Sequence, residues 1–278
     1  MNKGTPFKVA EGNLGLILSA AFLPLFRGGS GVFCAGYKSE LVEDNRVDAG
    51  NYTVAKFFGK RVQETSVVGT FPRPVQPLIL YEFEGCPFCR KVREACSILD
   101  LDVLTYPCPR DGPTYRPEAI KKGGKSMFPY LEDPNTNTAM YESDDIIRYL
   151  YKTYGNGEEG IPKSLTMGFF TVLTAGLGLM FRKGAGSKYV PAKKPDDMKP
   201  IVLYGYEASP FVKVVRERLN ELEIPHLYRH AARGSPKRQV VFEERGQFQV
   251  PFIEDPNTNK ALFESADILA YLDENYKM

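Results

Sequence analysis

An internal repeat constrains this chain more than any other feature. Residues 78–154 and 201–276 align almost end to end. LILYEFEGCPFCRKVREACSILDLDV matches IVLYGYEASPFVKVVRERLNELEIPH at an offset of 123, and FPYLEDPNTNTAMYESDDIIRYL matches VPFIEDPNTNKALFESADILAYL at an offset of 122. The repeat extends upstream, because LFRGGSG and MFRKGAG each close an uncharged apolar run. Self-similarity on this scale predicts two copies of one structural module.

Each copy has the pattern strand, helix, strand, loop, strand, hairpin strand, helix. In the first copy we expect a strand at 78–81, a helix that begins at Pro87, a strand at 102–106, a hairpin of 130–132 with 139–141, and a last helix capped by Ser143. A right-handed crossover makes the first two strands parallel. The sequence therefore predicts an α/β fold: two tandem thioredoxin-like (β-α-β-β-β-α) domains plus apolar helices.

The repeat also divides the chain into four segments. They are an N-terminal arm with an apolar helix (1–75), a first domain with CPFC (76–155), an apolar helix and linker (156–199), and a second domain with SPFV (200–278).

The two apolar runs, Leu14–Phe26 and Leu165–Phe181, carry no charge, and both are shorter than the roughly 20 residues of a membrane span. Helices that are apolar on all sides are buried or dock on something. We expect two helices that pack against each other or on the domains. Peripheral membrane contact or docking on a protein complex through 14–26 and 165–181 is the alternative.

Charge and cysteine content restrict the partners and the compartment. The 36 basic and 34 acidic residues leave a net charge of only +2, so no overall field attracts nucleic acid. The five cysteines are an odd number, and four of them lie between residues 86 and 108, unlike a disulfide-stapled secreted scaffold. Neither a secretory signal nor a transit peptide is visible at the N-terminus. We expect a reducing compartment, with a redox or metal role for the clustered cysteines.

Cys86 and Cys89 stand three residues apart at the predicted start of a helix, in EGCPFCRKV. A thiolate at Cys86 would face unpaired backbone N–H groups and the positive end of the helix dipole, which lower its pKa. Such a thiolate attacks disulfides, and Cys89 would resolve the mixed disulfide. Residues 90–91 add positive charge, whereas Glu82 and Glu84 oppose it. The alternative is a pair of small, half-buried residues at a helix cap.

The cysteines also permit a metal hypothesis. Cys86, Cys89, Cys96 and Cys108 supply four thiols, but zinc sites pair two closely spaced knuckles, and Cys96 lies on the far side of the predicted helix. We therefore predict no metal. Cys108 ends the second parallel strand, which reaches the same edge of the sheet as the first. Cys108 could therefore be a third thiol near the pair, but the preferred interpretation is an ordinary loop cysteine.

These motifs carry a family resemblance over about 150 residues. Both copies resemble the glutathione-binding N-terminal domain of glutathione S-transferases and glutaredoxins. The C-P-F-C motif is similar to that of glutaredoxins and of the membrane-associated prostaglandin E synthase type 2, and S-P-F followed by K-V-V-R resembles tau-class transferases of plants. Tandem proteins of this kind occur in plants, algae and some bacteria. The resemblance implies a chloroplast location, with the cytoplasm as the alternative.

The resemblance also implies glutathione as the cofactor and names its site. Phe128-Pro129 and Val250-Pro251 stand where the family has a cis-proline that offers backbone hydrogen bonds to glutathione. Glu142-Ser143 and Glu264-Ser265 resemble the pair that holds the γ-glutamyl group at a helix N-terminus. On the alternative interpretation, the prolines shape turns and the serines cap helices.

The second copy lacks the thiols. Ser209 stands in place of Cys86, and Val212 in place of Cys89, which removes disulfide chemistry there. Tau-class transferases also need a long helical domain that forms the electrophile pocket, and we expect none after either copy. We therefore expect a degenerate binding or packing module with Ser209, Val250, Pro251, Glu264 and Ser265 as its remnant site. The basic loop 233–238 could bind an anion or a partner protein, but we expect it to be exposed to solvent.

The leading hypothesis is a glutathione-linked thiol–disulfide oxidoreductase of glutaredoxin or transferase type. Its substrate would be glutathione or a small-molecule or protein disulfide. The rival is a non-catalytic scaffold or a subunit of a membrane-associated complex, which the thiol-free copy and the apolar helices favour. A prostaglandin-synthase-like isomerase is a third option, resting on C-P-F-C alone.

Overall fold

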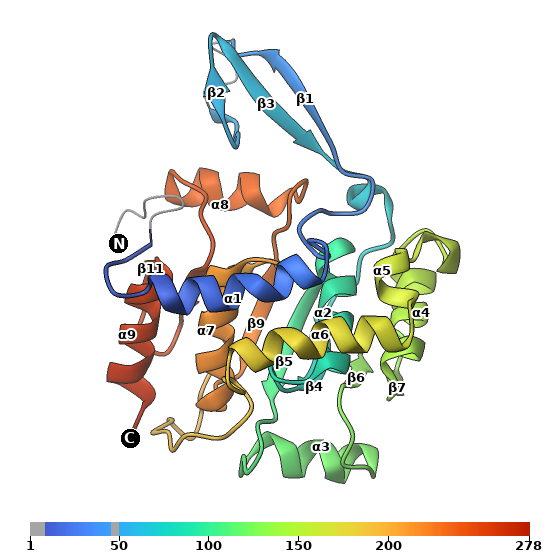
Figure 1. The fold of residues 1–278 in the computed structure, drawn as a ribbon, viewed down its shortest axis with the longest axis vertical. Coiled ribbons are helices and arrows are strands. Elements are labelled where there is room, and N and C mark those ends of the chain that lie inside the picture. Colours follow the sequence, from blue (N-terminus) through green and yellow to red (C-terminus); the bar gives the residue numbers. More distant parts are fainter. Residues whose placement is uncertain (1–8, 46–49) are drawn as a thin grey trace.

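The computed structural model describes residues 9–45 and 50–278. Two units, which we call unit one (78–154) and unit two (201–276), lie side by side around a central sheet (Figure 1). The helices are α1 (Leu14–Phe26), α2 (Pro87–Ile98), α3 (Tyr115–Gly123), α4 (Ser143–Tyr154), α5 (Lys163–Thr166), α6 (Phe169–Phe181), α7 (Pro210–Glu221), α8 (Lys237–Arg245) and α9 (Ser265–Tyr276), with 3₁₀ turns η2 (Val68–Thr70) and η3 (Glu158–Gly160). The strands are β1 (Lys38–Glu43), β2 (Lys56–Phe57), β3 (Lys60–Thr65), β4 (Leu78–Glu82), β5 (Asp102–Pro107), β6 (Tyr130–Asp133), β7 (Thr138–Met140), β8 (Ile201–Gly205), β9 (His226–His230), β10 (Phe252–Asp255) and β11 (Lys260–Phe263).

Each unit contains the predicted order of elements. In unit one, β4 and β5 are parallel, and β6 and β7 form an antiparallel hairpin; β8 with β9 and β10 with β11 repeat this in unit two. Helix α2 begins at Pro87, as predicted. Its apolar face, with Val92 and Leu99, packs against Ile146 of α4 in the core of unit one. The prediction of two thioredoxin-like α/β units is confirmed.

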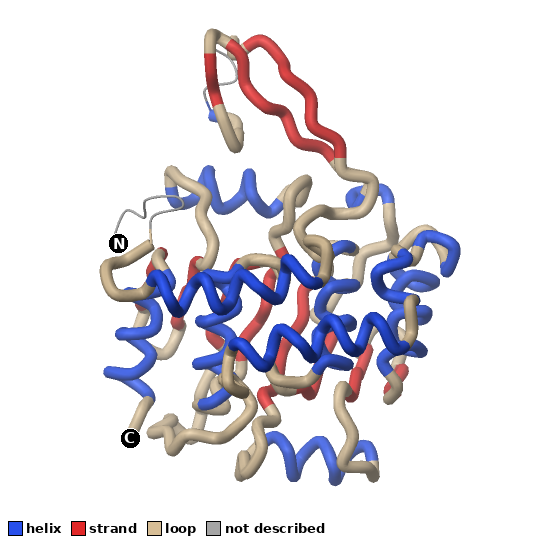
Figure 2. The backbone as a smooth tube through the Cα atoms, in the orientation of Figure 1, coloured by secondary structure: helices blue, strands red, loops and turns tan. Residues whose placement is uncertain are grey.

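The two units share one eight-stranded sheet in the order β11-β10-β8-β9-β5-β4-β6-β7 (Figure 2). At its centre β5 pairs antiparallel with β9, from Asp102 opposite Arg229 to Thr105 opposite His226. Each unit thus satisfies the unpaired backbone groups on the other's edge strand. The order reads the same from both ends, so an approximate two-fold rotation relates the units. We call the contact between the two units, which consists of the β5–β9 pairing and the buried ion pairs beside it, the seam. The sequence pattern did not predict it.

The apolar helices are exchanged between the units. Helix α1, which precedes unit one, packs against α7 of unit two, whereas α6, which precedes unit two, packs against α2 of unit one. The two helices also pack against each other in front of the sheet (Figure 1). Ile17 and Ala20 of α1 meet Val214 of α7 in one apolar cluster.

The second apolar run is broken, although the sequence indicated one segment over 165–181. Helix α5 ends at Thr166 and α6 begins at Phe169. Between them Gly168 has a φ of 53°, a left-handed conformation that glycine adopts without the penalty of a Cβ atom. Within residues 9–45 and 50–278, no helix has the length and apolarity that a bilayer crossing requires.

Two further elements differ from the prediction. The segment expected to be a loop in each unit contains a helix, α3 in unit one and α8 in unit two. The N-terminal arm contains a three-stranded antiparallel sheet in the order β1-β3-β2. This sheet rises above α8 of unit two (Figure 1). The strands of the arm thus lie over unit two, whereas Ala35 and Phe71 of the same arm pack against the core of unit one.

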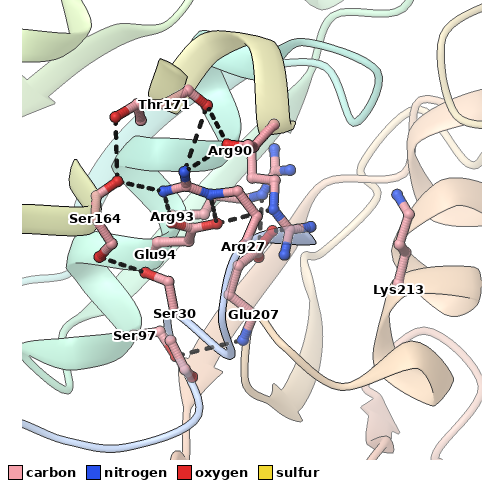
Figure 3. Close-up of polar contacts among 12 residues, drawn as sticks. Arg27, Ser30, Arg90, Arg93, Glu94, Ser97, Ser164, Thr171, Glu207 and Lys213 are labelled. Carbon is pink, nitrogen blue, oxygen red and sulfur yellow. Dashed lines mark hydrogen bonds and ion pairs between the residues drawn. The ribbon is translucent and has the colours of Figure 1, made fainter. Parts of the chain in front are cut away.

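The charged face of α2 is buried, although its sequence is that of an amphipathic helix. Arg90, Arg93 and Glu94 are at most 2% exposed. Glu207 of unit two binds Arg90 and Arg93, each at 3.2 Å, and also pairs with Arg216 (Figure 3). Buried charges persist only with partners, and here the two units supply them to each other.

The exchanged helices end in this same network. Arg27, which follows α1, binds Glu94 at 2.7 Å and donates to the carbonyl oxygen of Ser164 (Figure 3). Arg182, which follows α6, binds Glu217 at 2.5 Å. The pairs are equivalent in the repeat, so the motifs LFRGGSG and MFRKGAG each place one arginine in the seam.

Candidate functional site

Cys86 is the N-cap residue of α2 and follows the loop after β4. Its backbone is extended, with φ −93° and ψ 120°, and its Sγ accepts a hydrogen bond from the backbone N–H of Cys89 at 3.2 Å. The same Sγ lies 3.8 Å from the carbonyl oxygen of Phe128. Pro87 takes the first helical position, where a missing N–H costs nothing. The thiol thus lies at the N-terminal end of a helix, as the sequence indicated.

The two thiols of the motif have opposite electrostatic settings. The hydrogen bond from the Cys89 thiol lowers the pKa of Cys86 below its ordinary value, against the effect of burial. Burial raises the pKa of Cys89 well above its ordinary value, and the hydrogen bond to Cys86 adds to the rise. Cys86 is 4% exposed and Cys89 is fully buried. A thiol with a lowered pKa beside a thiol with a raised pKa favours exchange with an external disulfide, because the thiolate is the attacking species.

The acidic residues that precede the motif are paired away from the thiols. Glu84 binds Lys213 and Arg216 of unit two, each at 2.9 Å. Glu82 pairs with Arg93, although its charge still raises the pKa of the Cys86 thiol. The two basic residues after the motif are likewise held in ion pairs. The negative charges of Glu82 and Glu84, which precede the thiols in the sequence, are therefore largely neutralised by ion pairs.

The remaining cysteines are unpaired and buried in apolar surroundings. Cys96 belongs to the core of unit one, and Cys108 packs with Tyr81 and Tyr130. Burial raises the pKa of Cys96 to about 12 and also raises the pKa of Cys34 and of Cys108. In the described part of the chain, no group of three or more His, Cys, Asp or Glu side chains is placed to hold a metal ion.

The two predicted prolines occupy corresponding places. Pro129 and Pro251 each follow a cis peptide bond. Phe128, the residue before Pro129, brings its carbonyl oxygen to the sulfur of Cys86. Val250 is its counterpart in unit two and lines a cavity there. The proline segment therefore lies beside the N-terminus of the repeat's first helix.

An arginine that the sequence analysis did not single out lies over the ring of Phe128 in unit one. The guanidinium carbon of Arg116 lies 4.6 Å from the ring centroid of Phe128 and 5.5 Å from that of Phe83. Carbonyl oxygens of residues 108 and 109 hold this side chain in place. Arg238 is its counterpart in unit two, at an offset of 122, and this repetition was the available signal.

The predicted glutamate–serine pairs begin the last helix of each unit. Glu142 and Glu264 have φ values of 66° and 70°, a left-handed conformation that is costly for residues other than glycine. The prediction that Ser143 and Ser265 cap these helices is wrong: the serines are the first helical residues, and in this described region neither N-cap glutamate makes a side-chain capping hydrogen bond. Strain of this kind accompanies ligand sites in proteins.

The predicted second site forms a real cavity. Ser209, Val250, Pro251, Glu264 and Ser265 all line one space of about 420 Å³ in unit two. Ser209 is the N-cap of α7, and its Oγ accepts a hydrogen bond from the N–H of residue 212 at 3.3 Å. Unit two thus has a cavity at the place where unit one has its thiols.

Other residues of the cavity were not predicted. The arm supplies Tyr52 and Val54, and α8 with its preceding loop supplies Arg233 and Arg238. The expectation of a solvated basic loop is wrong, because Arg238 is only 5% exposed and is bonded to the arm. An arm some 180 residues distant in sequence leaves no local signal of this contact.

Comparison with known protein families agrees with this geometry. The model of the glutathione S-transferase N-terminal domain matches residues 80–159 and again residues 203–278, together more than half of the chain. None of the curated proteins that were compared with the chain matches it.

Two solved structures of the glutathione transferase BmGSTD1 of Bombyx mori are similar over one third of the chain. The complex with GTT is 30% identical, with a TM-score of 0.29, and a second structure is 31% identical, with a TM-score of 0.28. Each match covers 33% of this chain and 42% of the transferase. The chain thus spans less than half the length of these relatives.

Proposed function

Because the chain belongs to the glutathione S-transferase family through two copies of its N-terminal domain, we propose that it is a glutathione-linked thiol–disulfide oxidoreductase whose chemistry lies in unit one. The observation that carries the proposal is the hydrogen-bonded pair at the start of α2. Cys86 has a lowered pKa, whereas its neighbour Cys89 is buried and has a raised pKa. Unit two has a serine and a valine at these positions.

The exchange begins with a mixed disulfide. The Cys86 thiolate attacks one sulfur of a disulfide, the S–S bond breaks, and the other sulfur leaves as a thiolate that takes a proton from water. Cys89, after losing its proton to water, attacks the Sγ of Cys86, releases the second substrate sulfur as a thiolate and leaves a Cys86–Cys89 disulfide; a glutathione thiolate in its place leaves a Cys86–glutathione disulfide instead. One glutathione opens the Cys86–Cys89 disulfide to the Cys86–glutathione disulfide, and a second glutathione attacks the glutathione sulfur, which restores the Cys86 thiolate and releases oxidised glutathione.

Glutathione would bind beside Cys86, on the cis-proline segment and the start of α4. The carbonyl oxygen of Phe128 already faces the sulfur. Pro129, Glu142 and Ser143 are the equivalents of residues that line the cavity of unit two. Arg116, stacked on the Phe128 ring, supplies positive charge for a carboxylate of the tripeptide.

Reduction of a glutathione mixed disulfide, coupled to glutathione reductase, tests the proposal. We expect Cys86→Ser to lose at least about 100-fold in rate, because a serine hydroxyl does not replace an attacking thiolate. Cys96→Ser, a buried thiol in the same helix, is the matched control and should keep the wild-type rate. Equally low rates for wild type and Cys86→Ser would contradict the enzyme hypothesis.

A second candidate function is a non-catalytic subunit that binds a membrane surface. Helices α1 and α6 expose large apolar side chains that no described residue covers: Leu14, Leu18, Leu25, Phe169, Phe170 and Met180 are 54–73% exposed. Neither helix contains a charged residue. A face of this kind suits shallow insertion among lipid headgroups.

Vesicle flotation separates this function from the first. Wild type should float with anionic phospholipid vesicles, and Leu18→Glu combined with Phe169→Glu should not. Wild type that stays unbound would exclude the membrane surface. The chloroplast location stays a prediction, which a C-terminal fluorescent fusion in plant cells would check.

A further inference from the structure

We propose that the cavity between unit two and the arm binds a small aromatic carboxylate. This site is distinct from the thiol site of unit one, and the proposal does not depend on the oxidoreductase function. Its walls come from two parts of the chain, because Tyr52, Thr53 and Val54 of the arm lie across from the start of α7 and the loop before Pro251. At about 420 Å³ the space falls in the range of small-molecule sites.

The walls favour a flat apolar body. Tyr52, Tyr206, Phe211 and Phe248 all line the space. The ring of Tyr52 meets that of Phe248 nearly edge-on, with centroids 5.1 Å apart. An aromatic ligand can stack on such rings in offset or edge geometry and gain more than from area burial alone.

Two arginines at one end favour an anion. Arg233 and Arg238 share the carboxylate of Glu64 on β3. The lining also contains the carboxylate of Glu264, which accepts a hydrogen bond from Gln249. Arg238 donates from Nε to the carbonyl oxygens of residues 231 and 232 and from Nη1 to the Tyr52 hydroxyl. A ligand carboxylate beside the two arginines would accept charge-assisted hydrogen bonds from them.

The lining of the cavity contains a buried acceptor that has no partner among the described residues. The amide of Gln249 donates from Nε2 to Glu264 at 2.8 Å, while its Oε1 is buried and has no partner within the described part of the chain. Leaving such an atom unpaired costs free energy unless a ligand or water meets it. A hydroxyl on the aromatic ligand would satisfy this oxygen.

The arm is fastened over the cavity by specific bonds. Ser66 donates from Oγ to the carbonyl oxygen of Gly234 at 2.7 Å, and Gln239 joins the carbonyl oxygen of residue 50 to the N–H of Tyr52. At the corresponding loop of unit one, the linker after α6 pairs Lys188 with Arg110 in an isolated bridge.

Unit one has a larger side chain at the position of Val250. Phe128 stands where unit two has Val250, and its ring is covered by Arg116. In unit two the smaller valine leaves room, and Arg238 instead lies over Phe248, 4.8 Å from the ring centroid. Val250→Phe should therefore fill the cavity with a residue that the same backbone accepts in unit one.

Fluorescence anisotropy of 1-naphthoate on the full chain tests the site, since the chain contains no tryptophan that would absorb the excitation light. We expect saturable binding to wild type and at least about tenfold weaker binding of the neutral 1-naphthalenemethanol, which cannot pair with the arginines. Val250→Phe should weaken naphthoate binding at least about tenfold by overpacking the space. Val240→Phe, on the exposed side of α8, is the matched control and should bind as wild type does.

A second variant keeps the test decisive if Val250→Phe does not fold, which circular dichroism would reveal. Arg233→Gln should weaken naphthoate binding without changing that of 1-naphthalenemethanol. Equal naphthoate affinity in wild type, Val250→Phe and Arg233→Gln would overturn the proposal. So would complete displacement of naphthoate by an excess of reduced glutathione, which would assign the cavity to the tripeptide.

Discussion

Unit one and unit two share their strands, helices and cis-prolines, yet each keeps a different half of a binding site. Unit one has the thiol pair, with Arg116 over the ring of Phe128 beside it. Unit two has no thiol at the equivalent place, but it has a cavity to which the arm contributes Tyr52 and Val54. The fold of unit two therefore forms without the cysteines. They are not needed to hold the scaffold together, which strengthens the argument that Cys86 and Cys89 have a chemical role.

Both units contribute residues to the seam. Breaking its ion pairs should have the largest effect on the free energy of unfolding. Glu207→Ala should destabilise the chain by about 3–5 kcal/mol, because Arg90, Arg93 and Arg216 would lose a buried partner. Urea unfolding measures the change.

The control for the seam is Glu254→Ala, which breaks a half-exposed pair with Arg245. It should cost only about 0–1 kcal/mol. Similar costs for both variants would mean that the buried network contributes no more than a surface pair does.

The seam strand of unit two carries both histidines of the chain, and unit one has none at these positions. Burial lowers the pKa of His226 to about 4, from an ordinary value of 6.5. The unfolded chain thus binds more protons below pH 6.5, so stability is complete above that pH and is lost as the pH falls towards 4. The loss from His226 alone should be roughly 3 kcal/mol.

His226→Val, which copies Val103 of unit one, isolates this contribution. Urea unfolding at pH 7 and at pH 4.5 should show a smaller acid loss in the variant than in wild type. Parallel losses in both proteins would assign the acid sensitivity to other groups.

Thiol labelling sharpens the comparison of the two helix starts. At pH 7 iodoacetamide should modify Cys86 first, and the rate should fall as the pH drops through the lowered pKa of Cys86. Ser209→Cys places a thiol at the same N-cap of α7, where the backbone N–H of Val212 still donates, but Val212 has no thiol to give the side-chain hydrogen bond that Cys89 gives. In a Cys86→Ser background it should react at least about tenfold more slowly. Peptide mass spectrometry reads both rates, and equal rates would show that the helix end alone activates the thiol.

The arm should give the smallest effect. Ser66→Ala removes the hydrogen bond to Gly234 and should cost about 1 kcal/mol of arm docking. Hydrogen exchange should then be faster in α8 of unit two and unchanged in α3 of unit one. Equal exchange in wild type and variant would show that the arm is held by its other contacts.

The sequence predicted the features that depend on neighbouring residues. The repeat, the order of elements and the helix start at Pro87 all follow from local patterns. The residues Ser209, Val250 and Ser265 were also predicted to share one site, and they line one cavity.

What the sequence did not reveal depends on contacts between distant segments. The charged face of α2 looks solvated in a local window, because the covering residue Glu207 is more than 100 positions away. The pairing of β5 with β9 leaves no trace in the alternation of either strand, since any edge strand offers the same backbone groups. The arm contact between Tyr52 and Arg238 was missed for the same reason.

The exchange of α1 and α6 has a consequence for synthesis on the ribosome. Helix α1 is made before unit one, but the surface that buries Ile17 and Ala20 belongs to α7, which ends at Glu221. Until that residue has left the exit tunnel, the apolar helix and the charged face of α2 both lack their native cover. A nascent chain that stops after unit one therefore exposes apolar surface to chaperones and to self-association. Two such chains could pair through β5, the strand that pairs with β9 in the complete fold.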